Sequence, residues 1–312
     1  MSSFKPPLGL SNPHLQTMCS SAVRKLVLRK SLAPFLLTSR SATFEVFGQK
    51  LSAAIHRQED PEAPMIAIVP GWLGSAESSY ALGFAHALWN TGYSIARLTL
   101  RDHGETAELN ETMFNSSLTD EVVQFVQASL DGAKTRGVLG FSLGGNFALR
   151  VARAEPDLTA LAICPAIEPR DTMFRIDRNF IYQRYFLNKW REIWRAKANV
   201  YPHLYRYSDI AHLNSIQTLT EHFVQKQTVY EDVASYFASY DLSGDALAGV
   251  DAKILAAADD PIIPFSDFAN LPDSLDIDVT QQGGHGAYLK NWQMDSWLDD
   301  YVVKHFQQHL PI

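Results

Sequence analysis

Short apolar runs alternate with longer amphipathic segments along most of this chain, and that rhythm is typical of α/β proteins. The apolar runs predict about eight strands. The first two are separated by a short segment that begins with Gly48, which predicts an antiparallel pair. The predicted strands cover residues 43–47, 51–56, 65–69, 93–100, 137–141, 158–164, 252–258 and 274–279.

Amphipathic segments between these strands predict helices over residues 79–90, 118–133 and 143–154, and a last helix over 289–310. A strand, a helix and a second strand in succession imply a right-handed crossover between parallel strands. We therefore expect a mostly parallel sheet flanked by helices.

The rhythm breaks over residues 166–249, where the sequence is helical in pattern and dense in aromatic and basic residues. We interpret this segment as a helical cap inserted into one core, which residues 43–165 and 250–312 build together. Residues 1–42 precede the first predicted strand, and we expect them to form an arm packed on that core.

One face of the predicted cap carries an apolar stripe at helical spacing. Two interpretations fit this stripe: it packs the cap onto the core, which is the commoner use of such a face, or it forms a wall against a bound acyl group. Both can hold for different residues. The stripe consists of Phe186, Trp190, Ile193 and Trp194.

The composition is that of a globular protein: 312 residues, 46% of them hydrophobic and 20% charged, which excludes disordered, collagen-like and coiled-coil chains. The longest uncharged stretch, residues 78–96, contains polar residues and two glycines, so it fails as a membrane span. The start lacks the apolar region of a secretory signal, and two distant cysteines, Cys19 and Cys164, fit a reducing compartment. We expect a cytoplasmic protein without a disulfide and without stable membrane insertion.

Charge is distributed unevenly along the chain. The net charge is −7, yet residues 1–44 contain six Lys and Arg and no acid, so the remainder carries −13. A basic, acid-poor start is found in transit peptides and in surfaces for anionic partners. The simpler interpretation, which we prefer, is a structural arm lying on an acidic body.

The sharpest motif is Gly140-Phe-Ser-Leu-Gly144, placed where a predicted strand ends and a predicted helix begins. A turn from strand to helix in one step strains the backbone of Ser142 and leaves no room for side chains two residues away, so glycine occupies both places. The pentapeptide alone is common in glycine-rich turns. Its position between strand and helix, with acid and base candidates following in the order Asp, His, favours a nucleophile.

His285, in a Gly-Gly-His-Gly loop after the last predicted strand, is the candidate base. Such a loop carries the imidazole over the sheet edge toward Ser142. Among the other nine histidines, only His103 also follows a strand at that edge. We take His103 as the alternative base, or else as a residue of the pocket wall.

The acid is expected after the strand 252–258, where two carboxylates stand side by side in Asp259-Asp260-Pro261. Asp260 fits a loop with Pro264 four residues on and lies 25 residues before His285, so we prefer it. Asp259 then orients the loop. The acid holds the imidazole in the tautomer that accepts the serine proton and stabilises the imidazolium.

Two backbone N–H groups are expected to stabilise the oxyanion. Leu143 N–H lies at the start of the helix after Ser142, and Trp72 N–H lies in the loop after the strand 65–69. Gly71 and Gly74 let the backbone of that loop come close to a substrate, although a lone G-x-x-G also suits any tight turn.

Together these residues resemble the α/β-hydrolase superfamily and, within it, the YheT-like branch of predicted serine esterases, over nearly the whole chain. The branch motifs are Asn-Pro-His-Leu-Gln-Thr at 12–17, Gly-x-x-Gly-Ser at 71–75, Gly-Gly-Asn at 144–146 and Asp-Asp-Pro at 259–261. Pro70 departs from the pattern, since many members have His there. The resemblance implies a triad of Ser142, Asp260 and His285 and an ester or lipid-like acyl substrate, with no metal or organic cofactor.

We therefore expect a carboxylic-ester hydrolase that acts through an acyl-enzyme on a small-molecule ester and binds no nucleic acid. An acyltransferase using the same triad is the nearest alternative, and a non-catalytic binding protein of the same fold is a second. The sequence leaves the oligomeric state open.

Overall fold

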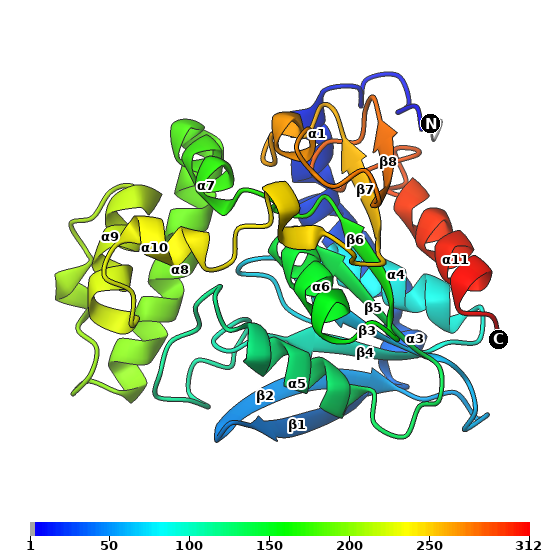
Figure 1. Ribbon diagram of the computed structural model, residues 1–312, viewed down its shortest axis with the longest axis horizontal. Coiled ribbons are helices and arrows are strands. Elements are labelled where there is room, and N and C mark those ends of the chain that lie inside the picture. The colour runs from blue at the N-terminus through cyan, green and yellow to red at the C-terminus, as the bar shows by residue number, and fades with distance from the viewer. Residues whose placement is uncertain (1–3) are drawn as a thin grey trace.

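The computed structural model describes residues 4–312 and contains one eight-stranded sheet at its centre (Figure 1). The strand order is β1-β2-β4-β3-β5-β6-β7-β8, with β1 and β2 forming an antiparallel hairpin and β2 pairing antiparallel with β4. All other neighbours are parallel. The strands are β1 Arg40–Val46, β2 Gln49–His56, β3 Met65–Val69, β4 Ser94–Thr99, β5 Arg136–Phe141, β6 Thr159–Ile163, β7 Lys253–Ala257 and β8 Asp276–Thr280. The predicted α/β-hydrolase fold, with a mostly parallel sheet of about eight strands, is confirmed.

Helices cover both faces of the sheet because side chains on one strand alternate between the faces. Met65, Ala67 and Val69 of β3 pack with α5 (Thr119–Ser129) and α6 (Leu143–Ala154) on one face. Ile66 and Ile68 pack with α4 (Ser79–Trp89) and α11 (Trp297–His309) on the other. The parallel strands therefore end together at one edge, where their loops build the site.

The last helix begins later than predicted. Residues 289–296 form a loop in which Leu289 pairs with Ser296 in an isolated β-bridge. Leu289 and Met294 are buried against Leu10 of the N-terminal arm, so their apolar pattern reflects packing on the arm and not a helical face. Ser296 then caps α11 by accepting a hydrogen bond from Leu298 N–H.

The N-terminal residues lie against the core as short helices: α1 (Pro13–Met18), a π-helix (Cys19–Val23), α2 (Arg24–Ser31) and α3 (Ala33–Leu36). Arg24 fixes this arm, because its buried guanidinium pairs with Asp299 of α11 at 2.5 Å and donates to the Met294 carbonyl. Further along, Phe35 stacks on His56 of β2, with ring centroids 4.2 Å apart. The predicted arm ends slightly earlier than residue 42, since β1 starts at Arg40.

Four helices between β6 and β7 lie at one side of the molecule, at the left of Figure 1. They are α7 (Pro169–Arg178), α8 (Phe180–Val200), α9 (Ile216–Gln227) and α10 (Val233–Ala238). Lys197 of α8 is fully buried and pairs with Asp102, which follows β4, at 2.7 Å. Burial raises the pKa of Asp102 to about 6, while the Lys197 ammonium opposes that rise. This ion pair ties the cap to the loop after β4.

No helix in residues 4–312 is both long enough and apolar enough to cross a membrane.

Candidate active site

Ser142 occupies the turn between β5 and α6 with φ of 57° and ψ of −119°. A positive φ is costly for a residue with a side chain, so the surrounding packing must enforce it. A Cβ at Gly140 would overlap the Gly144 carbonyl, and one at Gly144 would overlap the carbonyls that end β3. The two glycines therefore let the turn close as predicted, and Ser142 lines a cavity of about 440 Å³.

Asp260 and His285 lie in contact. His285 Nδ1 and Asp260 Oδ2 are 2.8 Å apart, and both side chains are more than nine-tenths buried. The other oxygen of Asp260 accepts hydrogen bonds from Ile262 N–H and Ile263 N–H, at 2.7 and 2.9 Å. These bonds fix the carboxylate orientation. Nε2 is consequently the imidazole nitrogen left for the cavity.

Asp259 has a different partner. Its carboxylate accepts a hydrogen bond from Gly284 N–H at 2.9 Å, so it holds the loop of His285 and not the imidazole. Burial raises the pKa of Asp259, and the backbone hydrogen bond from Gly284 opposes this rise. The structure thus places Asp260 beside His285, whereas Asp259 makes the contact with the histidine loop that was predicted for it.

The N-terminal arm also holds the loop of His285, which the sequence did not reveal. Thr17 Oγ1 accepts a hydrogen bond from His285 N–H at 3.0 Å and donates to the Pro13 carbonyl at 2.7 Å. Gln16 is buried and accepts from Leu289 N–H at 3.1 Å. The Asn-Pro-His-Leu-Gln-Thr motif was the available signal, but nothing in its residue types pointed to this partner.

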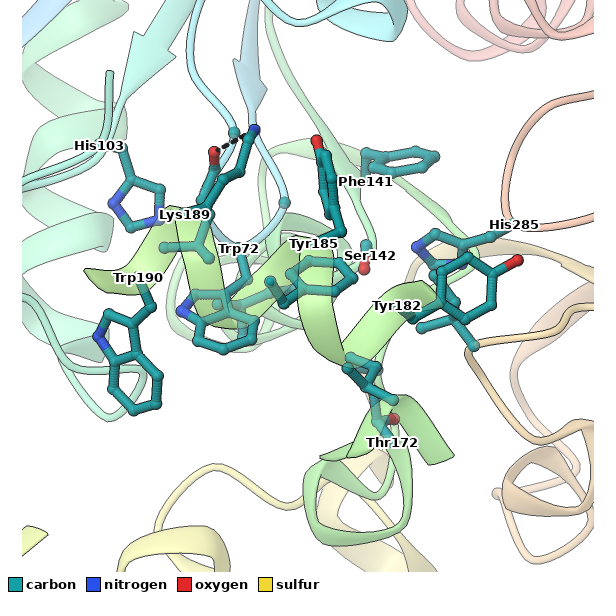
Figure 2. Close-up of a pocket in the computed structure, with 18 of the residues that line it drawn as sticks. Trp72, His103, Phe141, Ser142, Thr172, Tyr182, Tyr185, Lys189, Trp190 and His285 are labelled. Atoms are coloured by element: carbon teal, nitrogen blue, oxygen red, sulfur yellow. Dashed lines mark hydrogen bonds between the residues drawn. The ribbon is translucent and has the colours of Figure 1, made fainter. Parts of the chain in front are cut away.

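Figure 2 shows Ser142 and His285 on the same side of the cavity, with Phe141 behind them. The His285 ring meets Phe141 edge to face at 5.1 Å, and Phe141 in turn stacks on Tyr80 at 4.0 Å. Tyr80 Oη accepts a hydrogen bond from Gly71 N–H at 2.9 Å. An aromatic chain thereby links the base to the loop after β3.

His103 lies across the cavity and is not beside Asp260. One ring nitrogen, Nδ1, donates to the Arg101 carbonyl at 2.8 Å, and the ring meets Phe114 edge to face. Burial lowers the pKa of His103 to about 4, so the ring is neutral near pH 7. This placement matches the wall position that we gave as its alternative to a base.

The loop after β3 brings Trp72 into the cavity. Gly74 N–H donates to the Gly71 carbonyl at 2.9 Å and closes a tight turn, in which Leu73 has φ of 58°. Pro70 is buried where this turn begins. Leu143 is the first residue of α6, so its N–H has no acceptor inside the helix. Both predicted oxyanion residues line the cavity with Ser142.

Helix α8 packs directly on this loop. The Trp72 ring stacks on Phe186 at 5.4 Å and meets Trp190 edge to face at 5.2 Å. Between these two contacts, Lys189 Nζ donates to the Leu73 carbonyl at 3.3 Å, as the dashed line in Figure 2 shows. The loop conformation therefore depends on the cap.

Some residues of the apolar stripe line the cavity, and others pack inside the cap. Phe186, Trp190 and Ile193 line the cavity, whereas Trp194 is buried inside the cap against Tyr205 and His222. Most of the remaining wall is apolar or aromatic, with contributions from all three parts of the chain.

A cluster of three acidic residues lies outside the cavity wall. Carboxylate oxygens of Glu168, Asp171 and Asp267 lie within 4.8 Å of one another. Burial, followed by the two neighbouring acids, raises the pKa of Asp267 to about 7. None of the three lines the cavity of Ser142, so they stand apart from its chemistry.

Comparison with solved structures shows the same fold at low sequence identity. The 2,6-dihydroxy-pseudo-oxynicotine hydrolase is 18% identical with a TM-score of 0.57, over 93% of this chain and 74% of that one. The alpha/beta hydrolase GrgF from Penicillium is 14% identical with a TM-score of 0.56, over 88% and 99%. The Pyrococcus furiosus esterase Pf2001 is 13% identical with a TM-score of 0.51, over 86% and 92%.

Sequence comparison gives a family but no individual relative. No curated protein sequence matches the chain. The family model described as the alpha/beta hydrolase family matches residues 66–299, which run from β3 into α11. This match spans most of the chain and includes the elbow, the acid loop and the histidine loop, so the chain belongs to the alpha/beta hydrolase family.

Proposed function

We propose that this protein is a serine hydrolase that cleaves a carboxylic ester through an acyl-enzyme, as in the YheT-like branch that its motifs resemble. The observation that carries the proposal is the buried Asp260–His285 hydrogen bond, 2.8 Å long, opening on the same cavity as the strained Ser142. That pairing is the arrangement by which a serine is activated.

In the proposed reaction, Ser142 Oγ attacks the ester carbonyl carbon while its proton passes to His285 Nε2. Asp260 stabilises the imidazolium from the Nδ1 side, and the N–H groups of Trp72 and Leu143 stabilise the oxyanion. The proton then goes to the departing alcohol, and water attacks the acyl-enzyme with His285 as its base. Acid and alcohol leave, and Ser142 regains its proton.

The cavity wall supports an acyl or lipid-like substrate. It is predominantly apolar, and three residues of the stripe face into it. Such walls bind apolar groups, while a few polar groups fix the orientation. The proposal requires neither a metal nor an organic cofactor. It places the protein in the cytoplasm, without nucleic-acid partners, in keeping with the free thiols of Cys19 and Cys164.

Labelling with a fluorophosphonate tests the nucleophile. We expect covalent labelling of the wild-type protein and none of Ser142→Ala, followed by hydrolysis of an acyl-chain series of aryl esters by the wild type. Equal labelling of both proteins would exclude Ser142 as the nucleophile. Labelling with slow hydrolysis in water alone, together with faster consumption of the ester when alcohols are added, would favour the acyltransferase. Failure of the wild type to label would favour a binding protein.

A further inference from the structure

Apart from histidines, three residues of the acidic and basic types line the cavity: Asp102, Lys25 and Lys189. Asp102 is already paired, because the fully buried Lys197 lies 2.7 Å from its carboxylate. The charge left over at the cavity is therefore that of two lysines. In a protein with a net charge of −7, a cationic pair at the site is a local exception.

Neither lysine has a carboxylate within 4.0 Å among residues 4–312, whereas their basic neighbours in the arm do. Arg24 pairs with Asp299, and Arg29 lies 3.7 Å from Glu77. Lys189 Nζ uses one of its three N–H donors on the Leu73 carbonyl and lies 5.0 Å from the centre of the Tyr185 ring. Its other donors remain for a ligand.

The two lysines line the same cavity, so their positive charges act on each other. Burial lowers the pKa of Lys25, and Arg29 and Lys189 lower it further, against a smaller opposing effect of Glu77. Lys189 also lowers the pKa of His103 across the cavity, after the larger effect of burial. An anion bound between the lysines would relieve this repulsion.

The position of the lysines relative to the apolar wall gives the ligand its shape. Lys25 belongs to α2 in the arm. Lys189 belongs to α8 and lies beside the loop of Trp72, as Figure 2 shows. Wall residues deeper in the cap, such as Phe223 and Ile193, are apolar. The cavity therefore combines two lysine cations with a wall that is mostly apolar or aromatic.

We propose that Lys25 and Lys189 form an anion subsite, so that the substrate is an amphiphilic ester carrying a carboxylate or phosphate group. That the ligand is a substrate rests on the proposed ester hydrolysis, whereas the anion subsite itself concerns only binding. The apolar part of the ligand lies on the aromatic wall and the anionic group lies at the arm, between the two ammonium groups.

The test measures binding of four eight-carbon amphiphiles to the full chain by titration calorimetry: octanoate, octyl phosphate, octanol and octylammonium. We expect the better anion to bind about tenfold more tightly than octanol, as for charge-assisted contacts at a partly exposed site. Octylammonium should bind more weakly than octanol. Whichever anion binds more tightly identifies the group that the subsite takes.

Single substitutions Lys25→Met and Lys189→Met should each reduce the preference for the anion over octanol about threefold, and the double substitution should abolish it. Lys189→Arg should retain it. Lys30→Met is the matched control, because Lys30 is an exposed cation of the same helix that does not line the cavity, so the preference should not change.

Equal affinity for octanol and both anions in the wild type would overturn the subsite, and so would an unchanged preference in the double variant. Repeating the titrations with Ser142→Ala, and following turnover of neutral 4-nitrophenyl octanoate in parallel, separates the two proposals. Anion preference without turnover refutes only the hydrolase, whereas turnover without anion preference refutes only the subsite.

Discussion

The two halves of the candidate site are held by different kinds of contact. On the side of His285, hydrogen bonds dominate: Asp260 accepts two from backbone N–H groups, Asp259 accepts one from Gly284 N–H, and Thr17 accepts one from His285 N–H. On the oxyanion side, hydrogen bonds also close the loop of Trp72, but the Trp72 side chain itself is held by ring contacts with Phe186 and Trp190 of the cap.

This difference has a mechanical consequence. Hydrogen bonds are directional and fail over a few tenths of an ångström, so the base half has one arrangement. Ring stacking tolerates sliding, so the Trp72 side chain can follow α8 when the cap shifts, within the limits set by the hydrogen bonds of its loop. Movement of the cap would therefore change the oxyanion half while the Asp260–His285 pair stayed in place.

The largest predicted effect comes from a change in the half of the site that contains Asp260 and His285. Asp260→Asn keeps the shape of the side chain but removes the charge that stabilises the imidazolium, so kcat for an aryl ester should fall about 10⁴-fold. Asp259→Asn is the matched control and should lose far less, because its contact is with Gly284 N–H. The reverse ranking of the two variants would show that Asp259 is the acid.

The second prediction concerns the oxyanion half. Trp72→Leu keeps the backbone donor but removes the stacking on Phe186 and Trp190, so kcat should fall about tenfold, less than the 10²- to 10³-fold effect of losing a donor outright. Fluorophosphonate labelling should slow in parallel, since it uses the same donors. Unchanged kcat in this variant would show that the cap does not support the loop.

A third, smaller effect tests the arm. Thr17→Val leaves His285 N–H without its acceptor, which costs about 1–3 kcal/mol, so kcat/KM should fall about tenfold. Thr17→Ser retains the hydroxyl and should restore most of the activity. Equal loss in the two variants would mean that the threonine acts through its methyl group and not through the hydrogen bond.

The last prediction concerns the stability of the fold at acidic pH and the attachment of the arm to the core. His56 is fully buried, accepts from Arg97 and contacts Thr38 at 2.9 Å; burial and then Arg97 lower its pKa to about 3. The folded state therefore binds fewer protons than the unfolded state between pH 6.5 and 3. The free energy of unfolding should therefore decrease as the pH is lowered through this range, by about 1.4 kcal/mol per pH unit for this proton.

Urea unfolding at pH 7 and pH 5 checks this pH dependence by comparing the wild type with His56→Gln. The difference between them isolates His56, because the other buried titratable groups are common to both proteins. If the free energy of unfolding decreases from pH 7 to pH 5 no more in the wild type than in the variant, His56 is not the group responsible.

Much of the fold and the convergence of Ser142, Asp260 and His285 in space were predictable because their signals are local. The elbow around Ser142 needs glycines at fixed spacing, and the acid and base follow strand ends in a fixed order. The last helix was placed eight residues too early because Leu289 and Met294 are apolar for contact with the arm. No local pattern shows such a contact.

The support of the base by Thr17 and Gln16 escaped prediction for the same reason. A threonine and a glutamine carry no chemistry of their own, and their partners lie 268 and 273 residues away in the chain. The pairing of Lys197 with Asp102 likewise joins the cap to a loop after β4. Residue type suggests a partner only when its place in space is known.

The hydrogen bond from His285 to Thr17 bears on the order in which the molecule is assembled. During synthesis, the Thr17 segment leaves the ribosome first and must wait until 268 further residues have been added before its partner exists. Contacts of such long range form late and slow folding. The nascent chain therefore completes its base loop only after the rest of the sheet, so an incomplete translation product would carry the serine without a positioned histidine.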